Sequence, residues 1–117
     1  MNPANSVRVA YDDLRSLGFA GIGANYAAVG AAFANPVRLI KITNLTDVTL
    51  KVSFDGIHDQ DIAPFLSSNI YDYGSNMGAK AGLMELPVGN RVYVKREAAV
   101  NPASGNVYVT VIYAAQK

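Results

Sequence analysis

The chain has 117 residues, a length that fits one domain and argues against two. It contains no cysteine, which excludes disulfide frameworks, thiolate zinc sites, iron–sulfur clusters and cysteine nucleophiles. Ten Lys and Arg residues balance nine Asp and Glu residues, and the net charge of +1 provides no electrostatic attraction to nucleic acid.

The beginning of the chain predicts a short N-terminal arm at residues 1–17, followed by one β-domain at residues 18–117. The arm is polar and mixed, and residues 11–15 offer at most one helical turn, which is marginal by itself. Such an arm either becomes ordered on a partner or docks on its own domain. It lacks a basic region followed by an apolar run, so we expect no targeting signal. We also expect no membrane contact, because Gly and Asn residues interrupt the weakly polar stretch at residues 19–35.

Residues 19–29 alternate loosely and predict a first strand that its glycines weaken. Gly21 and Gly23 form a Gly-x-Gly pair, but Tyr26 stands where a dinucleotide-binding loop has its third glycine, and no helix follows. We therefore expect no nucleotide cofactor at this segment.

Residues 37–43 and 48–54 predict two strands joined as a β-hairpin. The second strand alternates strictly between apolar and polar residues, which is typical of a strand with one buried face. The first carries apolar residues on both faces, as in a strand that is covered on two sides. Residues 44–47 suit a type I turn between them. The cover for the second face is the other sheet, the segment at residues 19–33 or a neighbouring subunit.

The rest of the chain adds short strands separated by turns. Strands are expected at residues 69–73, 83–86, 91–96 and 107–113, with a flexible loop at residues 74–82 and a turn at residues 101–106. About six to eight short strands without a long helix are typical of sandwiches and barrels. The sequence therefore predicts an all-β fold, a single-domain antiparallel β-sandwich or jelly-roll-like barrel.

The cluster of ionisable side chains at residues 55–61 resembles a site. Asp55, His58, Asp59 and Asp61 are side chains of the kinds that bind calcium or zinc. Their spacing fits neither a calcium loop nor a zinc motif, and a solvated loop with Asp residues in turns explains them better. No Ser lies in a Gly-x-Ser-x-Gly context, and the two Glu residues are far apart in the chain. The sequence therefore predicts no enzyme activity, no metal site and no cofactor.

Tyrosines on outward strand faces predict an interaction surface. Tyr93 and Tyr108 each lie on the face opposite to a row of valines. Interfaces are enriched in tyrosine, which buries a large area at little cost in rotamer entropy. Either these two rings contact a subunit or stack on a sugar, or the fold itself covers both sheet faces; for Tyr71 and Tyr73, cover within the fold is favoured. The candidate interface residues are Tyr11, Leu14, Leu39, Tyr93, Tyr108 and Ile112.

Four stretches resemble small virion proteins of tailed bacteriophages. They are GIGANY at residues 21–26, NPVRLIKITN at 35–44, VSFDG at 52–56 and VYVTVIY at 107–113, and the resemblance covers about residues 18–113. The resemblance lies in the residue pattern of the predicted strands and in the Asn-Pro-x-Arg and Ser-Phe-Asp-Gly motifs, not in a catalytic signature. The resemblance implies a β-sandwich or jelly-roll subunit that decorates the capsid or builds the neck or tail.

Composition points independently to assembly. Charged residues make up only 16% of the chain against 50% hydrophobic residues, too little charge to cover the surface of a monomer. With the resemblance, this predicts a non-enzymatic, homo-oligomeric structural subunit, made in the host cytoplasm and localised in the virion. Its expected partners are itself and capsid, portal or tail proteins, reached through the arm and the loops at residues 55–63 and 74–82. The alternative is a carbohydrate- or receptor-binding β-sandwich module.

Overall fold

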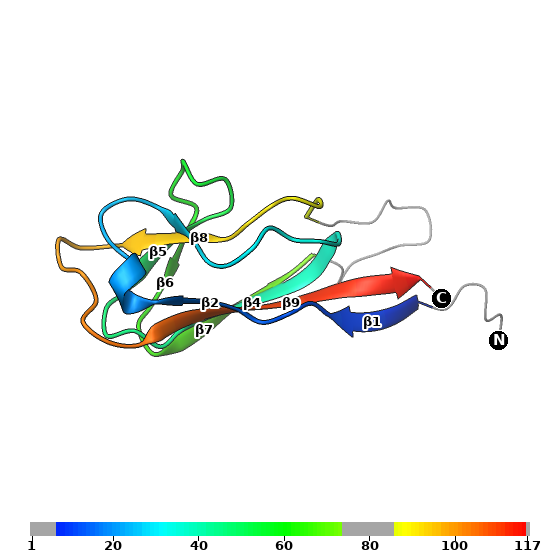
Figure 1. Ribbon diagram of the computed structural model, residues 1–117, viewed down its shortest axis with the longest axis horizontal. Helices are drawn as coiled ribbons and strands as arrows, with labels where there is room; N and C mark the ends of the chain where they lie inside the picture. Colours follow the sequence, from blue (N-terminus) through cyan, green and yellow to red (C-terminus); the bar gives the residue numbers. More distant parts are fainter. Residues whose placement is uncertain (1–6, 74–85, 117) are drawn as a thin grey trace.

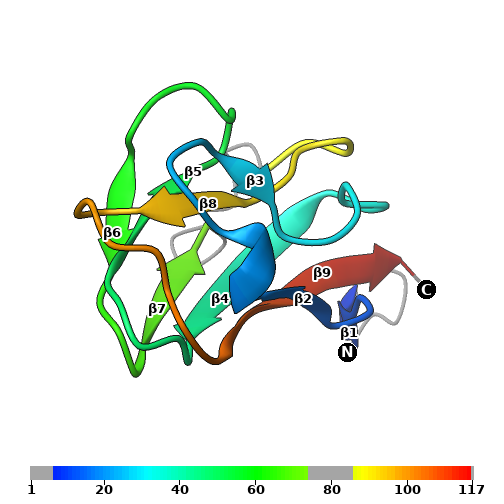
Figure 2. The same cartoon turned by 60° about the vertical axis from the view of Figure 1, so that its left-hand side comes forward.

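Two antiparallel sheets pack face to face and enclose the hydrophobic core (Figure 1, Figure 2). The computed structural model describes residues 7–73 and 86–116. Within them, sheet A has the strand order β1-β9-β4-β7, with β2 also paired to β9, and sheet B has the order β3-β8-β5-β6. The prediction of an all-β antiparallel sandwich is confirmed. The described part of the chain holds no helix long and apolar enough to cross a membrane.

The described strands are short, except for two long strands in sheet A, β4 and β9. Sheet A consists of β1 (Val7–Tyr11), β2 (Arg15–Gly18), β4 (Val37–Asn44), β7 (Ser67–Asp72) and β9 (Asn106–Gln116). Sheet B consists of β3 (Ala27–Ala28), β5 (Leu50–Ser53), β6 (Asp61–Ala63) and β8 (Tyr93–Arg96), and a 3-10 turn, η2 (Phe19–Gly21), follows β2.

The long strands β4 and β9 form the centre of sheet A. They pair antiparallel from Val37 opposite Tyr113 to Asn44 opposite Val107. Alternate side chains of both strands are buried against sheet B, as expected for strands with one face on a core. The buried core side chains are Ile22, Val29, Phe33, Val37, Ile40, Ile42, Leu50, Val52, Ala63, Val92, Val94, Val107, Val109 and Val111.

A bulge in β4 explains why its sequence is apolar on both faces. The register with β9 shifts between Val37 and Leu39. The side chains that point into the core are therefore at odd-numbered positions before the bulge and at even-numbered positions after it. Val37 and Ile40 are therefore both buried, although strict alternation would place them on opposite faces. Leu39 remains on the face that points away from sheet B, and the core covers only one side of β4.

The predicted hairpin is wrong, because β4 and β5 belong to different sheets. Both edges of β4 are occupied, one by β7 and the other by β9, while β5 pairs with β6 and β8. No edge of β4 is left for β5. The chain instead turns a corner after Asn44 and crosses the core to sheet B.

A buried polar network holds this corner. The side-chain amide of Asn44 donates to the carbonyl oxygens of Val48 at 3.0 Å and Ala63 at 2.9 Å. Its carbonyl oxygen accepts hydrogen bonds from the backbone N–H and the hydroxyl of Thr46, at 3.0 and 2.7 Å. Asn44 and Thr46 are fully buried, so these bonds satisfy groups that water cannot reach.

The predicted strand at residues 19–29 is also wrong over most of its length. Residues 19–21 form the 3-10 turn, and only Ala27–Ala28 is extended in a ladder, paired with β8. Ile22 and Val29 are both buried, so this segment carries the chain from sheet A to sheet B across the edge of the core. Glycine gives this stretch too little strand preference to pair over its whole length.

The described part of the predicted arm docks on its own domain. Both β1 and β2 pair with β9, and residues 11–15 form no helical turn. The side chain of Arg15 anchors the segment: its guanidinium donates to the carbonyl oxygens of Ala31 and Ala32, at 2.7 and 3.0 Å, and forms an ion pair with Asp12. Gly30 fits here because its φ is +73° and a Cβ would lie 2.7 Å from Arg15.

Most of the remaining strand predictions agree with the structure. The predicted strands at residues 48–54, 69–73, 91–96 and 107–113 overlap β5, β7, β8 and β9, with boundaries that differ by a few residues. The predicted loop at residues 74–82 and most of the strand at residues 83–86 lie outside the described residues. Leu86 forms an isolated bridge with Val37.

Replacing Asn44 with Ala should lower the free energy of unfolding by about 2–4 kcal/mol, because the Ala63 carbonyl and the Thr46 N–H lose their partner, and the Val48 carbonyl keeps only the Thr46 hydroxyl as a donor. Urea denaturation followed by circular dichroism measures this. Thr43→Val is the matched control, since the Thr43 hydroxyl bonds only to the exposed Ser68 hydroxyl. A loss below about 1 kcal/mol for Asn44→Ala would contradict a structural role for the corner.

Candidate functional site

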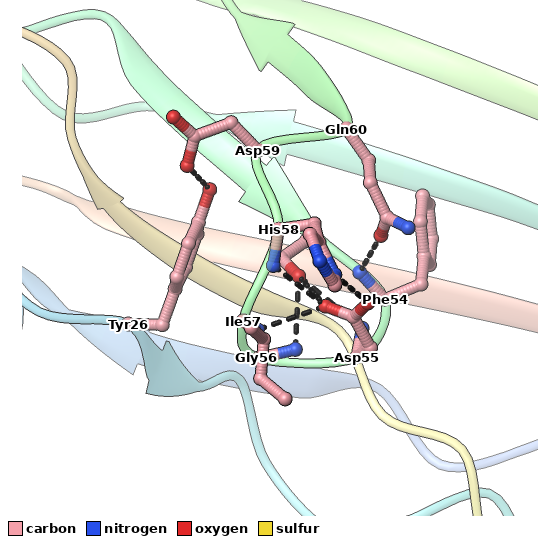
Figure 3. Close-up of polar contacts among 9 residues, drawn as sticks. Tyr26, Phe54, Asp55, Gly56, Ile57, His58, Asp59 and Gln60 are labelled. Atoms are coloured by element: carbon pink, nitrogen blue, oxygen red, sulfur yellow. Dashed lines mark hydrogen bonds and ion pairs between the residues drawn. The ribbon is translucent and has the colours of Figure 1, made fainter.

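The loop between β5 and β6 closes on itself through Asp55 (Figure 3). One carboxylate oxygen of Asp55 accepts hydrogen bonds from the backbone N–H groups of Ile57 and His58, at 2.8 and 2.9 Å, and from the hydroxyl of Ser53 at 2.7 Å. The other carboxylate oxygen lies 2.8 Å from Nδ1 of His58. These contacts, led by the backbone N–H of His58, hold the pKa of Asp55 well below its usual value.

Asp59 ties the same loop to the outer face of sheet B. It accepts a hydrogen bond of 2.6 Å from the hydroxyl of Tyr26 and lies 3.1 Å from Nζ of Lys51 and 3.3 Å from Nζ of Lys95. The two lysines are directly opposite each other in the β5–β8 pair, where like charges repel unless an anion separates them. The Tyr26 hydroxyl and the ammonium groups lower the pKa of Asp59 to about 2.

Asp61 faces a third direction. Its carboxylate accepts a hydrogen bond from the hydroxyl of Tyr71 on β7, and the side chain of Asn69 donates to the carbonyl of Ile62 at 2.7 Å. These contacts join the edge strands of the two sheets. Burial and the Asp61 bond raise the pKa of Tyr71, whose ring also meets Phe54 edge to face at 5.3 Å.

The carboxylates of residues 55–61 therefore do not converge on one point. Asp55 points to its own loop, Asp59 to Lys51 and Lys95, and Asp61 to Tyr71. Across the residues that the structure describes, no group of three or more His, Asp or Glu side chains is arranged to hold a metal ion. The cluster fixes a loop that covers sheet B, which agrees with the interpretation that its Asp residues make turns.

The outer face of sheet A presents a different surface. Tyr11, Ile112 and Leu39 lie directly opposite one another across β1, β9 and β4, and directly opposite residues share a face. The next row consists of Thr110, Lys41 and Ile70 across β9, β4 and β7. Tyr11 is 69% exposed and Ile70 is 65% exposed, whereas Leu39 and Ile112 are half-buried. We call these six residues the outer patch: Tyr11, Leu39, Lys41, Ile70, Thr110 and Ile112.

The predicted interface residues fall into two groups. Tyr11, Leu39 and Ile112 meet in the outer patch, and Tyr108 lies on the same face of β9, where its hydroxyl accepts a hydrogen bond from Asn106. Leu14 is exposed in the link between β1 and β2. The remaining residue, Tyr93, lies on the other sheet.

Three other tyrosines have neighbours within the fold. Tyr93 is half-buried, and its ring lies against Gly56 of the β5–β6 loop, within 3.4 Å of where a Cβ would be. Tyr71 and Tyr73 are half-buried against the core, which confirms that prediction. The sugar-stacking alternative needs exposed tyrosine faces on one surface, and Tyr93 and Tyr108 lie on opposite sheets.

Sequence reasoning missed Ile70 and Lys41. The alternation that buries Asn69 and Tyr71 toward β6 also places Ile70 on the opposite face, so the signal was present in the predicted strand at residues 69–73. In the sequence, Lys41 is an ordinary polar position of a strand, and its place in the outer patch follows only from its pairing with Ile70 and Thr110.

No family model matches the chain, and neither the curated proteins nor the solved structures contain a match.

The β5–β6 loop should lose its attachment at acid pH. Because the pKa of Asp59 is lowered from 3.8 to about 2, its contribution to stability is complete above pH 3.8 and disappears as the pH falls toward 2. The melting temperature of wild type should exceed that of Asp59→Asn at pH 6, and the difference should shrink as the pH approaches 2. A difference that stays constant from pH 6 to pH 2 would contradict the role given to the Asp59 carboxylate.

Proposed function

We propose that this chain is a non-enzymatic structural subunit of a tailed-phage virion, a capsid decoration or a neck or tail component, and that it acts by protein–protein assembly. The observation that carries the proposal is the outer patch of sheet A. On this face, which the core does not use, half-buried Leu39 and Ile112 lie between exposed Tyr11 on β1 and Asp72 on β7, and exposed Ile70 lies in the next row.

The contrast between the two sheets supports this proposal. The loop at residues 54–60 lies over the outer face of sheet B and is held there by Asp59, whereas Tyr11, Lys41 and Ile70 of the outer patch are exposed on sheet A. A surface that combines tyrosine, leucine and isoleucine with a few polar side chains is typical of protein interfaces. Burial of apolar surface contributes roughly 25 cal/mol per Å² to the free energy of association, from which the lost translational, rotational and side-chain entropy is subtracted.

The virion setting is supported by the resemblance of residues 35–44 and 107–113 to small phage virion proteins. Both stretches belong to the central pair of sheet A, β4 and β9, which supply the middle of the outer patch. The partners we propose are a second copy of this chain and, beyond it, capsid, portal or tail proteins. The carbohydrate-binding alternative has no comparable support, because Tyr93 lies against Gly56 and far from the patch, on the other sheet.

Replacing Ile70 with Ser should weaken self-association at least tenfold without unfolding the subunit. Ile70 is 65% exposed, so the isolated fold loses little, whereas an interface that buries it loses roughly 1.5–3 kcal/mol. Sedimentation velocity over a series of protein concentrations measures the change.

Ile57→Ser is the matched control, since Ile57 is 74% exposed in the loop over sheet B. It should leave association unchanged. A wild-type chain that stays monomeric at high concentration and binds no capsid, neck or tail protein, or an Ile57→Ser chain as impaired as Ile70→Ser, would refute assembly through the outer patch.

A further inference from the structure

One end of the sandwich carries a second apolar surface. Three loops meet there, at residues 45–49, 64–66 and 97–105, at the left-hand end of Figure 1. Hydrogen bonds join them: the N–H of Ala103 donates to the carboxylate of Asp47 at 2.9 Å, and the N–H of Glu97 donates to the carbonyl of Thr49 at 3.2 Å. The N–H of Phe65 donates to the Thr49 hydroxyl at 3.4 Å.

Large apolar side chains project from all three loops. They are between 47% and 66% exposed, and they are Leu45, Phe65, Leu66 and Val100. We call these four residues, with Asp47 and Glu97, the tip. Loops at the ends of sandwiches are ordinarily polar, so four exposed apolar residues on three connected loops need a physical reason.

Leu66 adds a second observation. Its φ is +56°, and among the described residues it is the one non-glycine residue with positive φ. The left-handed conformation disfavours a side chain with a Cβ, and glycine or asparagine would fit the turn with less strain. A leucine that is strained and 66% exposed contributes nothing to the isolated fold that glycine would not, which favours a role in contact with a partner.

The charge of the tip limits what it contacts. Its three loops contain Asp47 and Glu97, and the guanidinium of Arg96 reaches the same end, where it donates to the side chain of Asn101 at 2.8 Å, so the net charge there is −1. The whole chain has +1, so the rest of the chain carries +1 − (−1) = +2. An acidic surface is repelled by anionic lipid headgroups and by a second copy of itself, and it is attracted to an apolar surface that carries a cation.

The outer patch carries such a cation, Lys41, while Asp72 lies beside the patch on β7, opposite Leu39, and has an interaction of its own. Lys41 stands in its second row between Thr110 and Ile70, it is exposed, and it has no hydrogen bond or ion pair with another residue in the described part of the chain. The side chain of Glu97 is likewise exposed and unpaired among the described residues. Lys41 points away from sheet B, whereas Glu97 follows the last residue of β8 in sheet B, so the two cannot meet within one copy.

We propose that the tip of one copy docks on the outer patch of the next copy, with Glu97 against Lys41 and the apolar tip residues against the patch. The inference rests on the proposed function and names the partner of the same surface. Because the two surfaces differ, the contact is head-to-tail, and repetition gives a ring if the rotation closes or an open chain if it does not.

Charge reversal tests the contact directly. Lys41→Glu and Glu97→Lys should each reduce self-association at least tenfold, while an equimolar mixture of the two variants should recover it, since each acidic or basic tip then meets a patch of opposite charge. The double variant Lys41→Glu, Glu97→Lys should also recover. Sedimentation velocity measures all four samples, and circular dichroism confirms that each is folded.

Leu66→Gly tests the apolar part. It should weaken association while leaving the melting temperature of the dilute monomer unchanged or raised, because glycine relieves the strain at φ +56°. Val88→Ser is the control, an equally exposed apolar residue in another loop, and it should have no effect.

The outcomes separate this inference from the proposed function. A wild-type chain that does not self-associate overturns both the head-to-tail contact and self-assembly. Assembly that survives Glu97→Lys and Leu66→Gly but is lost in Lys41→Glu leaves the outer patch as an interface and overturns the head-to-tail contact. Failure of the variant mixture to recover also overturns the Glu97–Lys41 pairing.

Discussion

The arrangement of both sheets depends on the buried corner at Asn44 and Thr46. A strand as apolar as β4 would otherwise continue into a hairpin with the next strand, and its neighbours would change. The Asn44 side chain instead binds the carbonyl groups of Val48, just past the corner, and of Ala63, and so connects the end of sheet A to β6 of sheet B. Since the chain leaves sheet A there, β7 and β9 occupy both edges of β4. Leu39 and Lys41 thereby come to lie in the middle of a broad sheet face.

Because the chain changes sheets at this corner, the outer face of sheet A and the outer face of sheet B differ in what covers them. Beyond it, β5 places Lys51 opposite Lys95, and the repulsion between them is relieved by Asp59, which brings the loop at residues 54–60 down over sheet B. Sheet A has no described loop held over its outer face in this way. The polar side chains of the loop are thus used for internal cover, and we propose that the outer patch is the surface that a partner covers.

Sequence patterns predicted the fold class because the alternation in residues 107–113 and 91–96 depends only on each strand and one buried face. They failed for the hairpin because alternation does not reveal which edges of a strand are already paired. The bulge at Val37 and Leu39 further made β4 read as a strand covered on two sides. Tyr11, Leu39 and Ile112 were found separately as outward residues, but their meeting in one patch follows from the register of three strands. The tip could not be found at all, because exposed apolar residues in loops have no periodicity.

We propose that a second copy covers the outer patch of sheet A. The chain lacks cysteine, so introduced thiols report only the contact of interest. Chains carrying Val100→Cys and chains carrying Ile70→Cys should form a covalent dimer when mixed under mild oxidation, and neither should form one alone. Cross-linking of Ile70→Cys chains with each other would show a patch-to-patch contact instead, and no cross-linking in any sample at concentrations where the chain associates would contradict the account.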